Sequence, residues 1–480
     1  HGRVIEFDRM LVSSMKFGFP PLFALNQRCN KNTIQQVVEA GYECQVTPEP
    51  YLGGSEQGVI LRPRDAPSRQ VLVVNSRTHL SPQFDSILHT STALPSIVAI
   101  SAETIPVEWI RHPALAQIAV EPTDYAIRQQ DVCASWRNAF SFIQEDVTSQ
   151  TSGLRFPQIG ALHAVHMHWT VSEDAATIVM PTGTGKTETM LSVLISACCR
   201  RLLVVVPTDA LRVQIANKFL TLGLLKTIGV VASSALYPIV GILKHKPQTI
   251  QEVDVFFEKC NVIVTTMHIA GQCSGDIQER MAYHCPYLFI DEAHHIGAHT
   301  WQAFRHKFRA GRILQFTATP FRNDGKPVGG RIIYNYPLRK AQAEGYFRRI
   351  NFKPVLEFAL TKADKAIAER AVAQLREDRQ RHKHIVMARV GSVERAKEVF
   401  ALYKQYAEFN PVQIHSGLTA KERAQAREMI LSGQAKIVVC VDMLGEGFDL
   451  PELKIAAFHD IRKSLAVTLQ LAGRFTRARA

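Results

Sequence analysis

Residues 177–197, TIVMPTGTGKTETMLSVLISA, combine groups that suit a bound triphosphate. The stretch reads as an apolar strand, a glycine-containing turn and a helix. Gly183 and Gly185 permit backbone conformations that other residues avoid, so successive N–H groups can point at phosphate oxygens, aided by the helix dipole. Lys186 adds a charge for the β- and γ-phosphates, and the Thr187 hydroxyl is a ligand for Mg²⁺. The predicted phosphate loop comprises Pro181, Thr182, Gly183, Thr184, Gly185, Lys186 and Thr187.

This loop departs from the usual phosphate-loop pattern at one position. The pattern opens with glycine, and the sequence has Met180 there instead. Every group that would contact phosphate is nevertheless present. A glycine-rich turn without a ligand is the alternative, but the strand before the loop and the helix after it favour a phosphate site.

Two adjacent carboxylates end another apolar strand in the stretch YLFIDEAHH, residues 287–295. In open α/β sheets ligands bind at the carboxyl ends of the strands, so Asp291 and Glu292 are expected there. Asp291 could hold the Mg²⁺ that Thr187 also contacts, while Glu292 could orient and deprotonate the attacking water. An Asp-Glu pair that only caps a helix is the alternative. The four apolar residues before the pair favour the catalytic interpretation.

The two stretches resemble the phosphate-binding motif and the D-E-A-H box of the superfamily 2 helicases. Six further stretches resemble motifs of that family and follow its order along the chain: RFPQ (155–158), VVVPTDALRVQ (204–214), VIVTTMH (262–268), FTATPFR (316–322), VVCVDMLGEGFDLPEL (438–453) and QLAGRFTR (470–477). The variants TATPFRNDG, EGFDLP and LAGRFTR look most like the DNA-directed branch with restriction-enzyme motor subunits and UvrB-type repair proteins. The RNA-directed D-E-A-H helicases more often carry S-A-T and G-R-A-G-R at two of these places.

The resemblance implies that ATP is hydrolysed between two RecA-like lobes. The first lobe would supply the phosphate loop and the acids, and the second would present Arg477, and Arg474 after it, to the γ-phosphate. A guanidinium is always charged and can neutralise the charge that spreads over phosphate oxygens in the transition state. Hydrolysis would then require lobe closure, which couples the state of the nucleotide to lobe motion.

The resemblance also assigns residues to the nucleotide and to coupling. The residues implied to bind the nucleotide outside the phosphate loop are Arg155, Gln158, Gly447 and Asp449. Of these, Arg155 and Gln158 match the adenine-reading motif. The residues implied to couple hydrolysis to movement are His294, Thr317, Thr319 and Gln470.

Short apolar runs alternate with helical stretches in two parts of the chain, which predicts an α/β fold with parallel sheets. We expect two tandem RecA-like phosphate-loop domains, an ATP-binding domain at 151–345 and a helicase C-terminal domain at 346–480. A small α/β accessory domain of unknown function is expected at 1–150. Because the last motif nearly ends the sequence, we expect the second RecA-like domain to be C-terminally truncated.

The charge balance favours an anionic partner. The 480 residues carry 56 Lys and Arg against 43 Asp and Glu, a formal net charge of +13, as in many nucleic-acid-binding proteins. Together with the resemblance, this favours DNA over RNA. A bacterial restriction, defence or repair system is the expected setting, with a nuclease or another subunit as partner. ATP and Mg²⁺ are the expected cofactors.

Other functions fit parts of the sequence. A nucleic-acid-stimulated ATPase switch that closes on its ligand without travelling needs the same motifs, and so does an RNA helicase. A small-molecule kinase would use the phosphate loop but not the motifs of a second lobe. We expect an ATP-dependent helicase or translocase that acts on DNA.

Cysteine usage and hydropathy bear on location. The nine cysteines are scattered, odd in number and without a C-x-x-C pair, which is typical of reduced thiols in a cytosolic protein. No apolar run approaches the roughly 18 residues that a membrane span needs. We therefore expect a cytoplasmic enzyme with no membrane partner.

Overall fold

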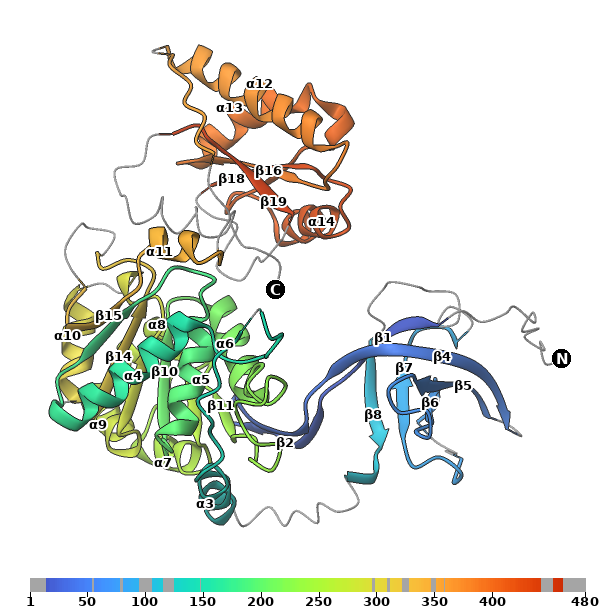
Figure 1. Ribbon diagram of the computed structural model, residues 1–480, viewed down its shortest axis with the longest axis vertical. Coiled ribbons are helices and arrows are strands. Elements are labelled where there is room, and N and C mark those ends of the chain that lie inside the picture. The colour runs from blue at the N-terminus through green and yellow to red at the C-terminus, as the bar shows by residue number, and fades with distance from the viewer. Residues whose placement is uncertain are drawn as a thin grey trace.

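Two parallel sheets and a third, mostly antiparallel sheet organise the chain in the computed structural model (Figure 1). The structure describes residues 14–53, 56–77, 81–94, 106–114, 125–146, 148–295, 298–308, 311–321, 328–346, 351–357, 359–441 and 452–460. The phosphate loop and the D-E-A-H stretch both belong to the largest sheet, which we call the first lobe together with its helices.

The sheet of the first lobe has the strand order β15-β9-β14-β13-β10-β12-β11-β3-β2. Its parallel strands are β9 (Ala176–Val179), β10 (Leu202–Val206), β11 (Val240–Ile242), β12 (Val262–Thr266), β13 (Tyr287–Ile290), β14 (Arg312–Thr317) and β15 (Arg331–Asn335). Every residue of β9, β10 and β12 is buried. Such strands must be apolar on both faces, and their sequences ATIV, LLVVV and VIVTT meet that requirement.

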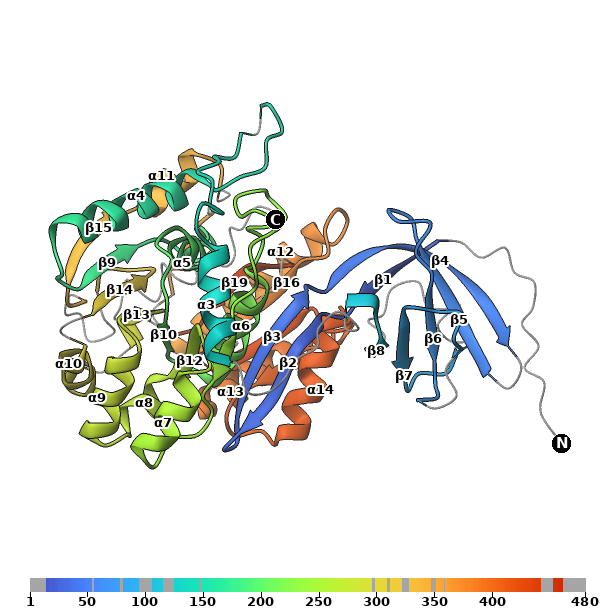
Figure 2. The same ribbon diagram turned by 90° about the horizontal axis from the view of Figure 1, so that it is seen from below.

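Helices cover both faces of this sheet (Figures 1 and 2). They are α4 (Phe156–Val171), α5 (Lys186–Ser196), α6 (Asp209–Thr221), α7 (Ile250–Phe257), α8 (Met267–Gly271), α9 (Gly275–His284) and α10 (Ala298–Lys307), with a short 3₁₀ turn η1 (Ala293–His295). Threonine side chains cap the amino ends of several of these helices. Thr208 caps α6 by accepting a hydrogen bond from Leu211 N, and Thr249 caps α7 in the same way from Glu252 N.

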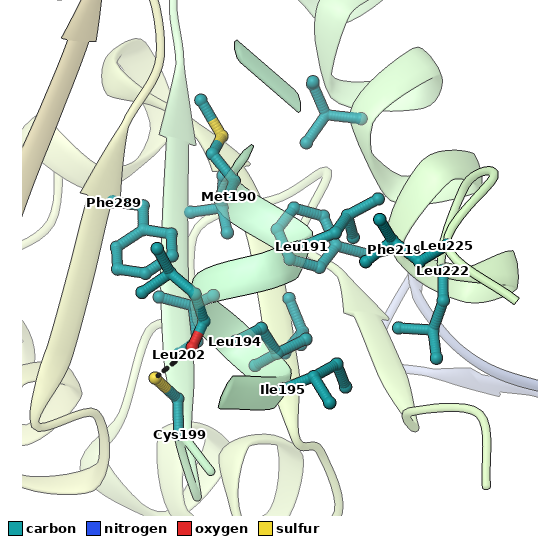
Figure 3. Packing of buried hydrophobic residues seen from close by; sticks show 14 of the residues in the cluster. Met190, Leu191, Leu194, Ile195, Cys199, Leu202, Phe219, Leu222, Leu225 and Phe289 are labelled. Atoms are coloured by element: carbon teal, nitrogen blue, oxygen red, sulfur yellow. Dashed lines mark hydrogen bonds between the residues drawn. The ribbon is translucent and has the colours of Figure 1, made fainter. Parts of the chain in front are cut away.

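The core of the first lobe surrounds α5, the helix that follows the phosphate loop. Met190, Leu191 and Leu194 of α5 are completely buried. In Figure 3 they pack among residues of α6 and β13, such as Phe219 and Phe289. This packing fixes the direction of α5 and hence the loop at its amino end.

The first 150 residues contribute to two sheets. One is a separate sheet with the order β1-β4-β5-β6-β7-β8, in which only the β6–β7 pair is parallel. Its strands are β1 (Met15–Phe19), β4 (Tyr42–Gly53), β5 (Glu56–Pro63), β6 (Val71–Val74), β7 (Ile87–Thr90) and β8 (Val107–Arg111). Between β1 and β4 lies a hairpin of β2 (Leu22–Cys29) and β3 (Asn32–Glu39). This hairpin belongs to the other sheet.

The hairpin extends the sheet of the first lobe. β3 pairs antiparallel with β11, with Gln35 opposite Val240 and Thr33 opposite Ile242. The Asn32 carboxamide oxygen also accepts hydrogen bonds from Lys244 N and His245 N, at 2.7 and 2.9 Å. Figure 2 shows the two strands running from the first lobe toward the separate N-terminal sheet.

One further element before residue 150 packs on the first lobe. This element is helix α3 (Tyr125–Ser135). The backbone oxygen of its residue Gln129 accepts a hydrogen bond from Asn261 Nδ2 of the first lobe at 3.2 Å. The hairpin and α3 both precede the expected boundary at residue 150, yet both pack with the sheet of the first lobe.

The second lobe is a smaller α/β unit. Its sheet has the order β17-β18-β16-β19, and all three pairings are parallel. The elements are β16 (Ile385–Val390), β17 (Val412–Ile414), β18 (Ile437–Val441), β19 (Leu453–Phe458), α12 (Leu360–Asp378), α13 (Val393–Lys404), α14 (Ala420–Leu431) and the 3₁₀ turn η2 (Ala407–Phe409). The α/β class with two parallel-sheet lobes is thus confirmed.

Two features of the whole chain complete the description. All nine cysteines are free thiols. Among the residues that the structure describes, none of the helices combines the length and the apolar character needed to cross a bilayer.

Candidate nucleotide-binding and hydrolysis site

The phosphate loop lies between the end of β9 and the first residue of α5. Gly183 and Gly185 adopt φ angles of +93° and +94°, in the region that favours glycine. A Cβ atom on Gly185 would also lie 1.9 Å from Gln158 Nε2, so the position has no room for a side chain. The Thr184 hydroxyl donates to Pro181 O at 2.7 Å and closes the turn. The loop is therefore a fixed cradle at the amino end of a buried helix, as phosphate binding requires.

Lys186 and the two acidic residues, Asp291 and Glu292, lie together at one edge of the sheet. Lys186, the first residue of α5, donates from Nζ to Glu292 Oε1 at 2.7 Å. The two residues are only 7% and 8% exposed. Glu292 has a φ of +47°, a conformation uncommon for a residue with a side chain, and its N–H donates to Asp291 Oδ1 at 2.9 Å. Glu292 thus sits in a backbone turn that directs its carboxylate at the phosphate loop.

The strand order explains why these residues meet. β14 lies between β9 and β13, and parallel strands end at the same edge. The backbone continues this alignment past the strands, because Met180 N donates to Thr317 O at 2.9 Å and Asp291 N donates to Val205 O at 3.0 Å. Residues that follow β9, β13 and β14 are therefore gathered at one carboxyl edge, the place where ligands bind such sheets.

A chain of side-chain contacts leads from Glu292 to Thr319. His294 Nδ1 lies 3.6 Å from Glu292 Oε2 and 2.9 Å from Thr317 Oγ1. The Thr317 hydroxyl donates to Thr319 O at 2.8 Å. Because that bond uses the only hydroxyl proton of Thr317, the contact with His294 requires a proton on Nδ1 of the imidazole. The structure therefore connects the predicted base to β14 through buried hydrogen-bonding groups.

Arg155 and Gln158 lie against the phosphate loop. Arg155 Nη1 donates to Gly183 O at 3.0 Å, and Gln158 Nε2 donates to Gly185 O at 3.4 Å. Gln158 Oε1 also accepts from Arg155 N at 2.7 Å, which holds the two residues against each other at the start of α4. The adenine-reading role of both residues stays a prediction, and a base that binds here would have to compete with these contacts.

Part of the predicted site lies outside the described residues. These positions are Gly447, Asp449, Gln470, Arg474 and Arg477. Pro181, Thr182 and Thr187 lie where the loop was expected, with Thr187 in the first turn of α5. Tyr346 is a residue that the sequence did not single out, although it contacts both Arg155 and Phe156. Nothing in the local sequence around it, AEGYFRR, signals a partner 190 residues earlier.

The residues present fit ATP with Mg²⁺. The glycine cradle and the buried Lys186 suit phosphate oxygens, and Asp291 is a buried carboxylate at the same edge. Within the described residues no group of three or more His, Cys, Asp or Glu could hold a metal ion alone. Mg²⁺ characteristically takes one or two carboxylates and completes its shell with substrate phosphates and water, so Asp291 and the Thr187 hydroxyl are sufficient protein ligands.

Two family models match the chain. The model described as the res subunit of type III restriction enzymes matches residues 151–322, and the model described as the helicase conserved C-terminal domain matches residues 367–479. The first match contains the phosphate loop, Asp291, Glu292 and the His294–Thr317 pair. The second contains the whole described sheet of the second lobe.

Two curated proteins resemble parts of the chain. A 51.5 kDa protein of a Lactococcus phage (isolate 7-9) is 25% identical over 258 residues, which are 49% of this chain and 56% of the phage protein. The ATP-dependent RNA helicase DRS1 of Candida glabrata is 29% identical over 66 residues, 14% of this chain and 9% of that helicase. The chain thus spans about half of the phage relative and much less of the yeast one.

Solved structures of helicases are similar at low sequence identity. The Pyrococcus furiosus Hef helicase domain has a TM-score of 0.41 at 14% identity, covering 65% of this chain and 92% of that one. Mss116p bound to ssRNA and AMP-PNP has a TM-score of 0.47 at 17% identity and 67% coverage of each chain. The DUF1998 helicase MrfA bound to DNA has a TM-score of 0.43 at 16% identity, with coverages of 67% and 44%.

Proposed function

The chain belongs to the superfamily 2 helicases, and from this premise we propose that it is an ATP-driven motor that translocates on DNA or separates its strands. The observation that best supports ATP hydrolysis is the meeting of Lys186, Asp291 and Glu292 at one carboxyl edge, beside the His294–Thr317 pair. Every one of these groups is buried, so each acts where water does not screen its charge.

The residues divide the work of hydrolysis between them. Lys186 and the loop N–H groups bind the β- and γ-phosphates, and Glu292 accepts the proton of the attacking water. Thr187 and Asp291 would hold Mg²⁺, which would supply charge neutralisation at the phosphate oxygens. Arg477 and Arg474 of the second lobe stabilise the transition state when the lobes close. His294 and Thr317 link Glu292 to β14 and so couple hydrolysis to movement.

DNA is proposed over RNA on two grounds. The family model that matches the first lobe is that of a restriction-enzyme subunit. The motif variants TATPFRNDG and LAGRFTR resemble those of DNA-directed helicases. The net charge of +13 suits either polymer through its phosphates. A restriction, defence or repair system, with a nuclease or another subunit as partner, is the proposed setting. The nine free thiols support a cytoplasmic place of action.

A second candidate is an ATPase switch that closes on nucleic acid without moving along it. The same site would serve it, because both functions need nucleic-acid-stimulated hydrolysis. RNA as the ligand is a third candidate, and the match to a protein named as an RNA helicase supports it.

Steady-state ATP hydrolysis tests these candidates directly. The full chain is assayed without nucleic acid and with single-stranded DNA, duplex DNA or RNA, and Lys186→Ala controls for contaminating ATPases. We expect either form of DNA to stimulate hydrolysis more than RNA does. A triplex-displacement assay then separates a translocase, which removes the third strand, from a switch, which leaves it bound. Greater stimulation by RNA would refute the DNA assignment.

A further inference from the structure

The segment that leads from the first lobe to the second folds back onto the nucleotide-reading residues. It comprises β15, the short helix α11 (Leu338–Ala343) and the turn that ends at Tyr346. Tyr346 N donates to Ala341 O at 3.0 Å, and Gly345 provides the turn with a φ of +79°. In sequence, Tyr346 lies between α11 of the first lobe and α12 of the second.

Tyr346 contacts two residues of the motif RFPQ. Its hydroxyl accepts a hydrogen bond from Phe156 N at 3.1 Å, satisfying one of the N–H groups that the first turn of a helix leaves without a partner. The guanidinium of Arg155 lies over its ring, 5.7 Å from the ring centroid. The other side of that guanidinium donates to Gly183 O. Arg155 is therefore held between the phosphate loop and Tyr346.

The surroundings of Tyr346 strengthen this arrangement. Lys340 Nζ of α11 lies 4.6 Å from the ring centroid of Phe156, so the same segment contacts the start of α4 at a second residue. Burial raises the pKa of Tyr346 to about 12, a rise opposed by the Phe156 N–H and supported by the negative charge of Glu145. The hydroxyl thus stays protonated near neutral pH.

We propose that Tyr346 is a positioning residue for the nucleotide base, which holds Arg155 and the start of α4 in place and ties them to the connection between the lobes. The inference deepens the proposed function and rests on ATP being the nucleotide. A base that binds at Arg155 must displace or share its contacts with Gly183 and Tyr346. Binding of a base at Arg155 would therefore change how Tyr346 is held, and Tyr346 belongs to the connection between the lobes.

The test compares ATP with inorganic tripolyphosphate, which carries the phosphates without a base. Binding of each to the full chain is measured by calorimetry without nucleic acid. Tyr346→Phe removes the hydroxyl and keeps the ring. Tyr336→Phe is the matched control, because the Tyr336 hydroxyl bonds to Glu344 in the same segment and the substitution keeps the ring that packs on Tyr346. Among the described residues, Tyr336 makes no hydrogen bond or ring contact with Arg155 or Phe156.

We expect Tyr346→Phe to weaken ATP binding roughly 2- to 10-fold, the loss of one hydrogen bond, and to leave tripolyphosphate binding unchanged. Tyr336→Phe should change neither. Equal weakening of ATP and tripolyphosphate would mean a merely structural role, and unchanged ATP binding would mean no role. If the wild type binds ATP, either result overturns this inference and leaves the proposed function standing. A wild type that binds neither compound would overturn the proposed function and the inference with it.

Discussion

Lys186 Nζ donates to Glu292 Oε1 at 2.7 Å, although 106 residues separate the two in sequence. Both are buried, and each is the other's counter-charge. Phosphate oxygens compete with Glu292 for Lys186, because a lysine in a phosphate loop is a point charge that follows the nearest anion. We therefore predict that bound ATP releases a Glu292 oxygen when a base is needed, so that phosphate recognition and base activation would be one exchange.

Replacing Glu292 by Gln tests this exchange. The amide cannot accept the proton of water and no longer pairs as a charge with Lys186. Hydrolysis at saturating ATP should fall about 10²- to 10⁴-fold, the usual worth of a general base. ATP affinity should hold or rise, because Lys186 is freed for phosphate. Single-turnover hydrolysis and equilibrium binding measure the two quantities.

Glu188→Gln is the matched control for that variant. Glu188 lies on α5 two residues after Lys186 but pairs with Lys218, at 3.2 Å. The Glu188→Gln protein should hydrolyse ATP at the wild-type rate. Wild-type turnover by the Glu292→Gln enzyme would remove Glu292 from the role of base.

The hydrogen bond between His294 and Thr317 should matter for coupling. Thr317→Val removes the hydroxyl with little change in shape, so Nδ1 of His294 loses its partner on β14. We expect basal ATP hydrolysis to stay within about twofold of wild type, while stimulation by nucleic acid falls about tenfold, the worth of a coupling of 1–3 kcal/mol. The ratio of stimulated to basal rate is the measurement.

Thr265→Val serves as the comparison for the coupling variant. Thr265 is also a buried strand threonine, and its hydroxyl donates to Leu243 O at 3.3 Å, away from Glu292. Its ratio of stimulated to basal rate should equal that of wild type. A Thr317→Val enzyme with a wild-type ratio would show that coupling does not pass through this bond.

The second lobe should lose stability in mild acid. Burial lowers the pKa of His459, and the contact of its Nδ1 with Asp364 at 2.9 Å opposes that shift without cancelling it. Tyr403 lies at its other nitrogen, and Arg395 pairs with both Asp364 and Asp460. The folded lobe therefore binds fewer protons than the unfolded chain once the pH is below the ordinary histidine value of about 6.5. Its free energy of unfolding should then fall as the pH drops.

Denaturant unfolding between about pH 8 and about pH 5 measures this dependence. The slope that His459 contributes cannot exceed about 1.4 kcal/mol per pH unit, the value for one proton. His459→Asn, which cannot titrate, should show a smaller loss than wild type over the same range. Identical slopes in the two proteins would exclude His459 as the source.

Local sequence patterns were sufficient for the phosphate loop and the two parallel sheets. Runs such as LLVVV and VIVTT are short and rich in β-branched residues, which favours strands covered on both faces, and a strand followed by glycines and Lys186 favours the loop. The resemblance to superfamily 2 helicases is confirmed by the two family models. The roles of individual site residues stay predictions, including those of the five positions outside the described residues.

Long-range pairings were not predictable in the same way. The stretch NTIQQVVE reads as a strand wherever it pairs, and only the structure shows that it adds to the free edge of β11. Ile34 and Val37 of this strand enter two different cores of the first lobe, one on each face. Tyr346 was missed for a similar reason, since its contact with Phe156 joins positions 190 residues apart.

The central claim is that ATP is hydrolysed between the two lobes, and Arg477 is its most direct test. The Arg477 guanidinium would act mainly on charge that develops in the transition state, so its loss should affect the rate of hydrolysis far more than ATP affinity. Arg477→Lys should rescue little, because an ammonium does not reproduce the guanidinium fork. Arg423→Ala, which alters an exposed arginine of α14 in the same lobe, is the control and should behave like wild type.

The decisive measurement is single-turnover hydrolysis by Arg477→Ala at saturating ATP with DNA present, with ATP affinity measured separately. The two-lobe mechanism predicts a fall in rate of about 10³- to 10⁵-fold with affinity nearly unchanged. Hydrolysis at the wild-type rate would contradict it.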